Sequence, residues 1–320
     1  MKTPVLFLIF NRPETTYRVF EAIRAYQPEE LFIAADGPRP HKEGEKALCE
    51  EVRRVADLVD WECKVHTLFR TENLGCKYAV SGAIDWFFSQ VEEGIILEDD
   101  CLPCPDFFRF CEEMLHRYRN EEKVMHIGGT NVQDGIQRGK ADYYYSRIAH
   151  VWGWASWRRA WRHYDVEMRD FPAYFRNKKD WNLFEGGKYM QWRFLLLFFR
   201  TWQNSPCFNT WDWQWNYALI KRKAFSIIPN VNLVSNVGGT STHTVDPHLC
   251  DRQCGSLPGK LHHPGRKCYD GIADAYSFCK IYKGTWKDRI RFWADRLHLS
   301  DTFSEIRHEP KEKTDHSHGK

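Results

Sequence analysis

Three consecutive carboxylates, Glu98, Asp99 and Asp100, follow a short apolar run at residues 95–97. Such a run is typical of a strand that is buried on both faces. Adjacent carboxylates disfavour joint ionisation, and a hard divalent cation bound together with phosphate oxygens removes that cost. The pattern therefore predicts a metal–diphosphate site where this strand ends, and the alternative is a solvated acidic strand end.

The first 130 residues alternate strand and helix patterns, which predicts a mostly parallel α/β sheet. Ligands of such sheets bind beyond the carboxyl ends of the strands. Asn11, Arg12, Asp36 and Asn73 follow predicted strand ends, so we expect them to share one crevice with the acidic triplet. The predicted strands cover residues 5–10, 31–35, 65–69, 95–97 and 124–127, and the predicted helices cover 13–26, 45–58, 77–90 and 106–120.

Several function classes are disfavoured by what the sequence lacks. No Gly-x-Gly-x-x-Gly follows the first predicted strand and no P-loop motif occurs, which disfavours dinucleotide oxidoreductases and P-loop enzymes. The net charge of +3 in 320 residues gives no support to a nucleic-acid partner. The apolar run at residues 5–10 is too short for a signal-peptide core, and the scattered cysteines are most simply reduced thiols. We therefore expect a cytoplasmic protein.

The second half of the chain is rich in tryptophan, and the whole chain has 14 Trp residues. Most of them are expected in the core, and the others are expected to line a cleft, because indole faces pack on the apolar faces of sugars. Here the patterns predict helices at residues 156–163, 189–201 and 212–221, a strand at 225–229 and an extended segment at 230–235.

The C-terminal region carries two further features. Residues 281–304 form a predicted basic amphipathic helix, with Trp286, Ile290, Trp293 and Leu297 at helical spacing. This stripe either packs on the core or on a second subunit of a homo-oligomer, or it lies on an anionic membrane surface at the cytoplasmic face. Residues 305–320 are polar and predicted to be disordered.

A zinc site is the less favoured interpretation of a cluster of cysteines and histidines in a predicted loop, because its first two cysteines are not spaced as in a usual zinc knuckle. The cluster consists of Cys250, Cys254, His262, His263 and Cys268.

Three motifs together resemble the GT-A glycosyltransferases, including the Golgi N-acetylglucosaminyltransferases and bacterial hemolysin-like sugar transferases. They are the start at residues 4–13 with Asn11-Arg12-Pro13, then Ala35-Asp36-Gly37, and the acidic triplet with Pro105-Asp106-Phe107-Phe108 behind it. The likeness covers about residues 4–245. It implies a GT-A, Rossmann-like sheet flanked by helices, with a nucleotide-sugar half at 1–130 and a Trp-rich acceptor half at 131–280.

The resemblance also implies roles on the donor side. Asp100 would ligate Mn²⁺, or Mg²⁺, that bridges the nucleotide diphosphate, and His243 would contact the metal or the diphosphate. Glu98 and Asp99 would hold the ribose, the sugar or metal-bound waters. Further donor-side contacts are implied for Arg12 with the nucleotide, Asp36 with the base or ribose, Trp154 near the donor sugar, and Asn11 and Asn73 at the neighbouring strand ends.

On the acceptor side, Trp211-Asp212-Trp213 resembles the Trp-Asp-Asp-Trp segment whose acid is the catalytic base, so Asp212 is the candidate base. A helix N-cap is its alternative. Simpler alternatives also exist for Arg12 as a partner of an acid, for Asp36 as a turn residue and for His243 as a surface residue.

These roles describe a metal-dependent, inverting glycosyltransferase that moves a sugar from a nucleotide-diphosphate donor, UDP-sugar favoured, to a carbohydrate hydroxyl of a glycan or glycoconjugate. A divalent cation would neutralise the leaving diphosphate and a carboxylate would take the acceptor proton. The alternatives are a non-enzymatic carbohydrate-binding protein, a glycosidase and a sugar nucleotidyltransferase. The last would need a Gly-rich loop and a Lys after the first strand, which are absent.

Overall fold

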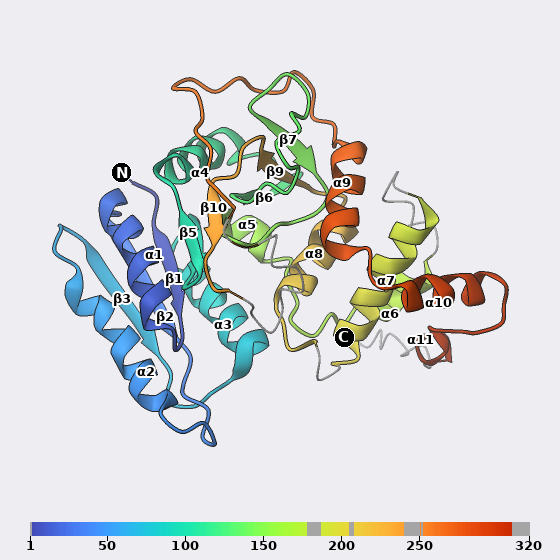
Figure 1. The fold of residues 1–320 in the computed structure, drawn as a ribbon, viewed down its shortest axis with the longest axis horizontal. Helices are drawn as coiled ribbons and strands as arrows, with labels where there is room; N and C mark the ends of the chain where they lie inside the picture. Colours follow the sequence, from blue (N-terminus) through green and yellow to red (C-terminus); the bar gives the residue numbers. More distant parts are fainter. Residues whose placement is uncertain (1, 178–186, 205–207, 240–249, 251, 309–320) are drawn as a thin grey trace, which may run out of the picture.

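The computed structural model describes residues 2–177, 187–204, 208–239, 250 and 252–308. Within them, eight strands form one central sheet in the order β3-β2-β1-β4-β8-β6-β9-β7 (Figure 1). β8 and β7 run antiparallel to their neighbours, and the other strands share one direction. The strands are β1 (Val5–Ile9), β2 (Glu30–Ala35), β3 (Lys64–Phe69), β4 (Glu93–Glu98), β6 (Val124–Gly128), β7 (Tyr143–Ser146), β8 (Trp154–Trp157) and β9 (Phe225–Pro229).

The chain reverses its direction of travel across the sheet between β1 and β4. It passes outward from β1 through α1 (Pro13–Tyr26) to β2, and through α2 (Glu45–Arg53) and a 3₁₀ turn (Arg54–Leu58) to β3. It then returns through α3 (Gly75–Gln90) to β4, which pairs with β1 on its other side. Because parallel crossovers are right-handed, α3 covers the face opposite to α1. The carboxyl ends of β1 and β4 therefore form a topological switch point, where ligands of open α/β sheets bind.

Helices cover both faces of the sheet. α4 (Pro105–Tyr118) packs beside α1, and the rings of Tyr26 and Phe108 stack with centroids 4.2 Å apart. On the other face, α3 contacts the short α5 (Arg158–Trp161), and the ring of Trp161 lies 5.2 Å from that of Trp215 in α8 (Asp212–Lys221). The predicted mostly parallel α/β sheet flanked by helices is thus confirmed.

Two predicted helices are wrong in their bounds. The one predicted at residues 281–304 is interrupted on both sides of α10, which covers only Trp286–Arg296. Residues 156–163 were expected to form a helix, but the chain forms β8 up to Trp157 and α5 begins at Arg158. β8 is inserted antiparallel between β4 and β6, where Trp154 faces both Ile96 and Gly128 in register. Backbone pairing on both sides decides the strand there, and the local sequence pattern does not reveal it.

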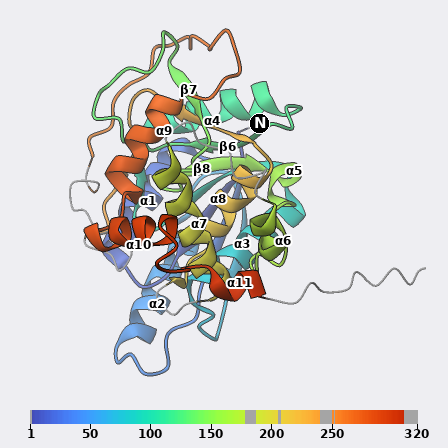
Figure 2. The same ribbon diagram turned by 90° about the vertical axis from the view of Figure 1, so that its right-hand side faces the viewer.

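The remaining helices pack around a second apolar core. They are α6 (Phe171–Arg176), α7 (Lys188–Trp202), a π-helical turn (Phe278–Tyr282), α10 (Trp286–Arg296) and α11 (Ser304–His308). α9 (Gly271–Ser277), which precedes the π-helical turn, packs its Ala273 with Tyr144 and Ile228 instead. Figure 2 shows α7, α10 and α11 on the face turned toward the viewer. The predicted disorder from residue 305 is wrong at its start, because α11 runs to His308 and Ile306 is fully buried in this core. None of the helices in the described ranges is long and apolar enough to cross a membrane.

A short two-stranded sheet lies next to the ends of β1 and β4. β5 (Cys101–Pro103) pairs antiparallel with β10 (Val234–Asn236), which overlaps the end of the predicted extended segment. β5 directly follows the acidic triplet, so Asp100 lies between β4 of the central sheet and β5 of this short sheet. The described residues after β10 begin with Val237, whose N–H donates to the backbone oxygen of Asp100 at 2.8 Å.

Candidate functional site

The acidic triplet is joined to the end of β1 by hydrogen bonds and ion pairs. Leu8 and Glu98 are partners in the β1–β4 register, and Asp99 Oδ2 accepts a 3.0 Å hydrogen bond from the N–H of Phe10. Arg12 follows at the start of α1, and its Nη1 lies 2.7 Å from Asp100 Oδ2 and 3.5 Å from Asp99 Oδ1. The structure thus brings Arg12 and the triplet together, as predicted from their positions after two strands.

The charges of this group are strongly coupled. Burial, and secondly the charge of Asp100, raise the pKa of the Asp99 carboxyl to about 7. Burial also raises the pKa of Glu98 well above its usual range, with further contributions from Asp100, Asp99 and Asp212. One guanidinium therefore does not neutralise the cluster, and the acids hold protons that a more highly charged cation would displace.

Asp100 lies where the backbone approaches very closely. A Cβ atom on Gly238 would lie 2.6 Å from Asp100 Oδ2, so no side chain fits at that position without a shift. Asp100 Oδ1 accepts from the thiol of Cys101 at 3.4 Å. No three His, Cys, Asp or Glu side chains converge into a complete metal site in the part of the chain that is described. The oxygen donors fit Mg²⁺ or Mn²⁺, which are commonly held by one or two carboxylates together with substrate phosphates.

Asp212 belongs to the same electrostatic environment, although it comes from the second half of the chain. It is the first residue of α8 and not its N-cap, and one of its carboxylate oxygens accepts from the hydroxyl of Thr210. Its charge contributes to the raised pKa of Glu98. The loop before it contacts the start of α3, where Asn209 Oδ1 accepts from the N–H of Lys77 at 3.2 Å.

Cys76, which the sequence did not single out, marks the centre of this environment. Burial raises the pKa of its thiol, followed by the charges of Glu98, Asp212, Asp36 and Asp100. These four acids come from three segments that are far apart in the sequence: the end of β2, the acidic triplet and the start of α8. Only its position one residue into the helix after Asn73-Leu74-Gly75 could have pointed to Cys76.

Asp36 and Asn73 form a hydrogen-bonded unit at the start of α3. The two carboxylate oxygens of Asp36 accept from the backbone N–H groups of Gly37, Leu74 and Gly75 at 2.9–3.2 Å. The Asn73 amide donates to Asp36 Oδ2 at 3.0 Å and to the Gly37 carbonyl at 2.7 Å. Asp36 therefore satisfies orphan donors at a helix start, and its contact with a base or ribose stays a prediction.

A second pair that the sequence analysis missed lies beside Asn11. Asn11 Nδ2 donates to Glu45 Oε1 at 2.8 Å, and the Arg39 guanidinium also pairs with this buried carboxylate. Hydrogen bonds from Arg39 lower the pKa of Glu45 to about 2. The Arg39 guanidinium also lies 5.6 Å from the centroid of the Phe10 ring. The available signal was a basic residue after Asp36-Gly37-Pro38, followed by an acid that opens the next helix.

Trp154 has a different environment from the predicted one. Its side chain is fully buried and packs among Trp161, Trp211 and Trp215. It also stacks on His126, which accepts from Trp215 Nε1 through Nδ1 at 3.2 Å and so donates through Nε2 to the His150 carbonyl at 3.1 Å. Trp154 is thus a core residue, and we leave it out of the site. His243 lies outside the described residues.

The cysteine and histidine cluster does not form a zinc site in the described ranges. Its members have separate partners. His262 pairs with Asp142, and His263 Nδ1 lies 3.1 Å from the Tyr143 hydroxyl. Cys250 donates to the Gly239 carbonyl, Cys254 lies 3.6 Å from Ser235 Oγ, and Cys268 donates to the Tyr269 carbonyl. Two surface cavities of about 380 and 300 Å³ also lie away from the acidic edge, between α7 and α11 and beside β7.

Comparison with known proteins adds a distant structural likeness. No known protein family and no curated protein matches this chain by sequence. Among 61 matching chains of solved structure is HddC from Yersinia pseudotuberculosis, with a TM-score of 0.31 and 12% identity. The alignment covers 49% of this chain and 77% of HddC. At this level of similarity, the likeness carries no argument about activity.

Proposed function

We propose that this chain is a metal-dependent, inverting glycosyltransferase that moves a sugar from a nucleotide diphosphate, with a UDP-sugar favoured, to a carbohydrate hydroxyl. The observation that carries the proposal is the meeting of Arg12, Glu98, Asp99 and Asp100 at the switch point between β1 and β4, within the electrostatic influence of Asp212. A surplus of carboxylates, approached by the backbone at Gly238 so closely that no side chain fits there without a shift, suits a cation that arrives with its diphosphate.

Asp100, with Asp99 and Glu98 near it, would hold Mn²⁺ or Mg²⁺, which supplies Lewis-acid stabilisation of the leaving diphosphate. Arg12 would pair with a diphosphate oxygen, because a guanidinium that already bridges two acids can exchange one of them for a phosphate. This exchange would release Asp100 toward the metal at the moment the donor binds.

Asp212 would act as general base toward the acceptor hydroxyl. The hydroxyl of Thr210 donates to one carboxylate oxygen, which orients the carboxylate at the first position of α8. In a single displacement, the acceptor oxygen forms its bond to the anomeric carbon as the bond to the diphosphate breaks, and the proton passes to Asp212. The sugar is then transferred with inversion.

The test is a screen of UDP-, GDP-, CMP- and dTDP-sugars with Mn²⁺, measured as nucleotide release with and without glycan acceptors. We expect Asp100→Asn to lose metal-dependent turnover and Asp212→Asn to lower kcat by about 10²- to 10⁴-fold while donor binding is kept. Asp60→Asn is the matched control, because Asp60 is an exposed carboxylate that pairs with Arg24.

Three results would overturn the proposal. Equal metal-dependent turnover in wild type and Asp100→Asn would remove the metal role. Thermal stabilisation by free glycans but not by UDP with Mn²⁺ would indicate a carbohydrate-binding protein or a glycosidase. Release of pyrophosphate from a nucleoside triphosphate and a sugar phosphate would indicate a nucleotidyltransferase.

A further inference from the structure

The helix α10 presents an apolar stripe to solvent. Trp286, Ile290, Trp293 and Leu297 lie along one side of the helix, at positions i, i+4, i+7 and i+11, and their exposed fractions are between 56% and 67%. Leu299, just beyond the helix, is 78% exposed. The prediction that this stripe packs on the protein's own core is therefore wrong. Two exposed indoles on one short helix require a different explanation.

The opposite side of α10 fixes the helix to the rest of the protein. Phe292 is buried, and its ring lies 5.3 Å from that of Tyr189 and 5.7 Å from that of Trp192, both in α7. Trp192 Nε1 also donates to Asp295 at 2.9 Å. The helix begins with a capping box made by Thr285 and Asp288. These contacts fix the orientation of α10, so that the apolar stripe stays exposed to solvent.

The charged residues of α10 are also divided between its two sides. Its two acids face the protein, where Asp288 pairs with Arg193 at 3.2 Å and Asp295 accepts from Trp192 and Ser300. The basic residues beside the stripe, Lys283, Lys287, Arg289 and Arg296, are exposed. Lys287 lies 5.8 Å from the Trp286 ring centroid and Arg296 lies 5.6 Å from that of Trp293, so cations flank the indoles directly.

We propose that this face of α10 binds the surface of an anionic lipid bilayer. Indole rings, aliphatic side chains and flanking cations on one side of a helix are the features of a helix that lies in the interface between headgroups and acyl chains. Because both acids of α10 face the protein, the exposed charged side chains of α10 itself are all cations, which complements anionic headgroups. This inference stands independently of the proposed reaction.

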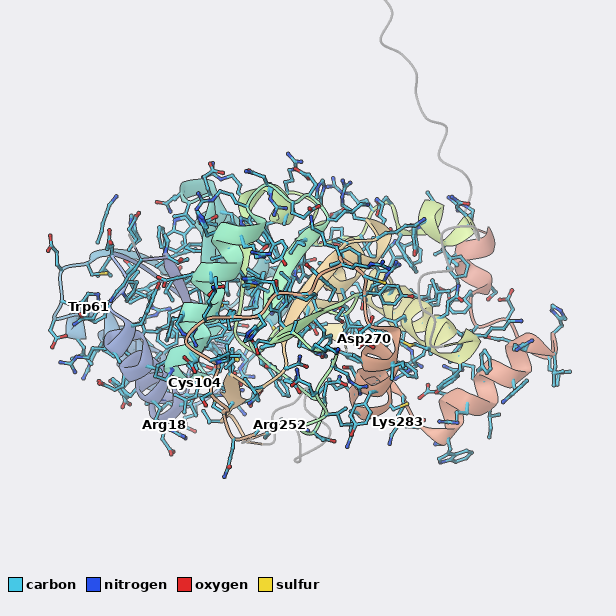
Figure 3. All side chains as sticks on the ribbon, turned by 90° about the horizontal axis from the view of Figure 1, so that it is seen from above. Arg18, Trp61, Cys104, Arg252, Asp270 and Lys283 are labelled. Carbon is cyan, nitrogen blue, oxygen red and sulfur yellow. The ribbon has the colours of Figure 1, made fainter. Side chains whose placement is uncertain are left out.

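The location of α10 is compatible with such binding. Figures 1 and 3 show α10 at the end of the molecule opposite α1 and α2, and Lys283 is labelled beside its start in Figure 3. A planar surface can therefore meet this end of the molecule while the β1–β4 edge lies elsewhere. A second copy of the chain is the other partner that could cover an apolar face, but it would place the same cations opposite each other.

The experiment is cosedimentation of the full chain with vesicles of phosphatidylcholine alone and of phosphatidylcholine mixed with phosphatidylglycerol. We expect binding only to the mixed vesicles, and a loss of at least about tenfold in the partition coefficient of Trp286→Ser/Trp293→Ser. Lys283→Gln/Lys287→Gln should lose on the order of tenfold or more, and added salt should reproduce that loss. These side chains are exposed, so thermal melting of the variants should match that of wild type.

Matched controls are Ile272→Ser, on an exposed apolar residue of α9, and Lys46→Gln, on an exposed cation of α2. Neither should change vesicle binding. Absence of binding to mixed vesicles, or equal binding to neutral vesicles, would overturn the proposal. So would light scattering that shows a wild-type dimer and a monomeric Trp286→Ser/Trp293→Ser variant, because the stripe would then be a subunit interface.

Discussion

Arg12 forms an ion pair with the carboxylate that we propose as the metal ligand: its Nη1 lies 2.7 Å from Asp100 Oδ2. The ion pair joins the start of α1 to the residue that follows β4, across the switch point of the sheet. If Asp100 holds a cation as we propose, that cation and Arg12 would compete for the same oxygen until a diphosphate provides Arg12 with a new partner.

This competition predicts opposite effects on two affinities. Arg12→Gln should bind Mn²⁺ alone more tightly, on the order of tenfold, because a repelling charge and a competitor are removed. The same variant should bind UDP in the presence of Mn²⁺ about tenfold or more weakly, because a charged hydrogen bond to phosphate is lost. Isothermal titration calorimetry measures both. Arg24→Gln, on an exposed arginine paired with Asp60, is the control. Parallel changes in the two affinities would contradict the competition.

The backbone contact at Asp100 gives a second prediction. In Gly238→Ala, the new methyl group would lie 2.6 Å from Asp100 Oδ2 and 2.9 Å from Asp100 Cβ, so the carboxylate must move. We expect binding of UDP with Mn²⁺ to weaken by about tenfold or more, since misplaced ligands lose their preorganisation. Gly259→Ala is the matched control, because nothing lies within 4 Å of its added Cβ. Calorimetry that gives the same affinity for both variants would show that Asp100 does not hold the metal.

Asp36 should matter for stability whether or not it contacts a nucleotide. Asp36→Ala removes the carboxylate that accepts hydrogen bonds from the N–H groups of Gly37, Leu74 and Gly75, two of which lie at the start of α3. We expect the free energy of unfolding to fall by about 2 kcal/mol, measured by urea denaturation. Asp57→Ala, at an exposed position of the 3₁₀ turn after α2, should change it by less than about 0.5 kcal/mol. Equal losses in the two variants would refute the capping role.

A buried acid away from the site predicts a pH effect on folding. Burial raises the pKa of Asp274 to about 7, although its carboxylate accepts from Ser146 Oγ at 2.5 Å and from the N–H of Arg147 at 3.0 Å. The unfolded value is near 4. The folded state therefore binds the extra proton between these values, and the stability that this group contributes at low pH is lost as the pH rises from about 4 to about 7.

Asp274→Asn should abolish this part of the pH dependence. Relative to wild type, the variant should gain stability between about pH 5 and pH 8, by an amount on the order of 3 kcal/mol. Asn can keep both hydrogen bonds, because the Ser146 hydroxyl can accept from its amide group while its oxygen accepts from Arg147. Urea denaturation at the two pH values measures the difference. A constant difference between variant and wild type would show that Asp274 is ionised throughout.

The first half of the fold was accessible from the sequence because its signals are local. Continuous apolar runs correspond to β1, β2 and β4, and the predicted helices at 13–26 and 77–90 match α1 and α3 to within two residues. The acidic triplet was found for the same reason, since strand ends can be located from where a run stops. Parallel topology then brings Arg12 to it without further information.

Other features depend on partners that are distant in sequence. The indole side chain of Trp154 is of a type that binds sugars, but it is buried because β4 and β6 pair on either side of β8. Asp36 and Asn73 were predicted as ligand contacts, and their hydrogen bonds to each other and to the start of α3 appear only when two loops meet. The local sequence does not show whether such a residue contacts a ligand or only other parts of the protein.

What the sequence determined by itself is the alternation of strands and helices, the position of three acids at a strand end, and a stripe of apolar residues on a basic helix. These features follow from local patterns in the sequence: repeats of two to four residues define the faces of strands and helices, and the point where an apolar run stops defines the end of a strand. Only the tertiary structure decided that Arg12 bridges Asp99 and Asp100, that Asp212 shares their field, and that the stripe of α10 faces solvent. Burial and electrostatic coupling depend on which segments surround a side chain, and no local pattern specifies its neighbours.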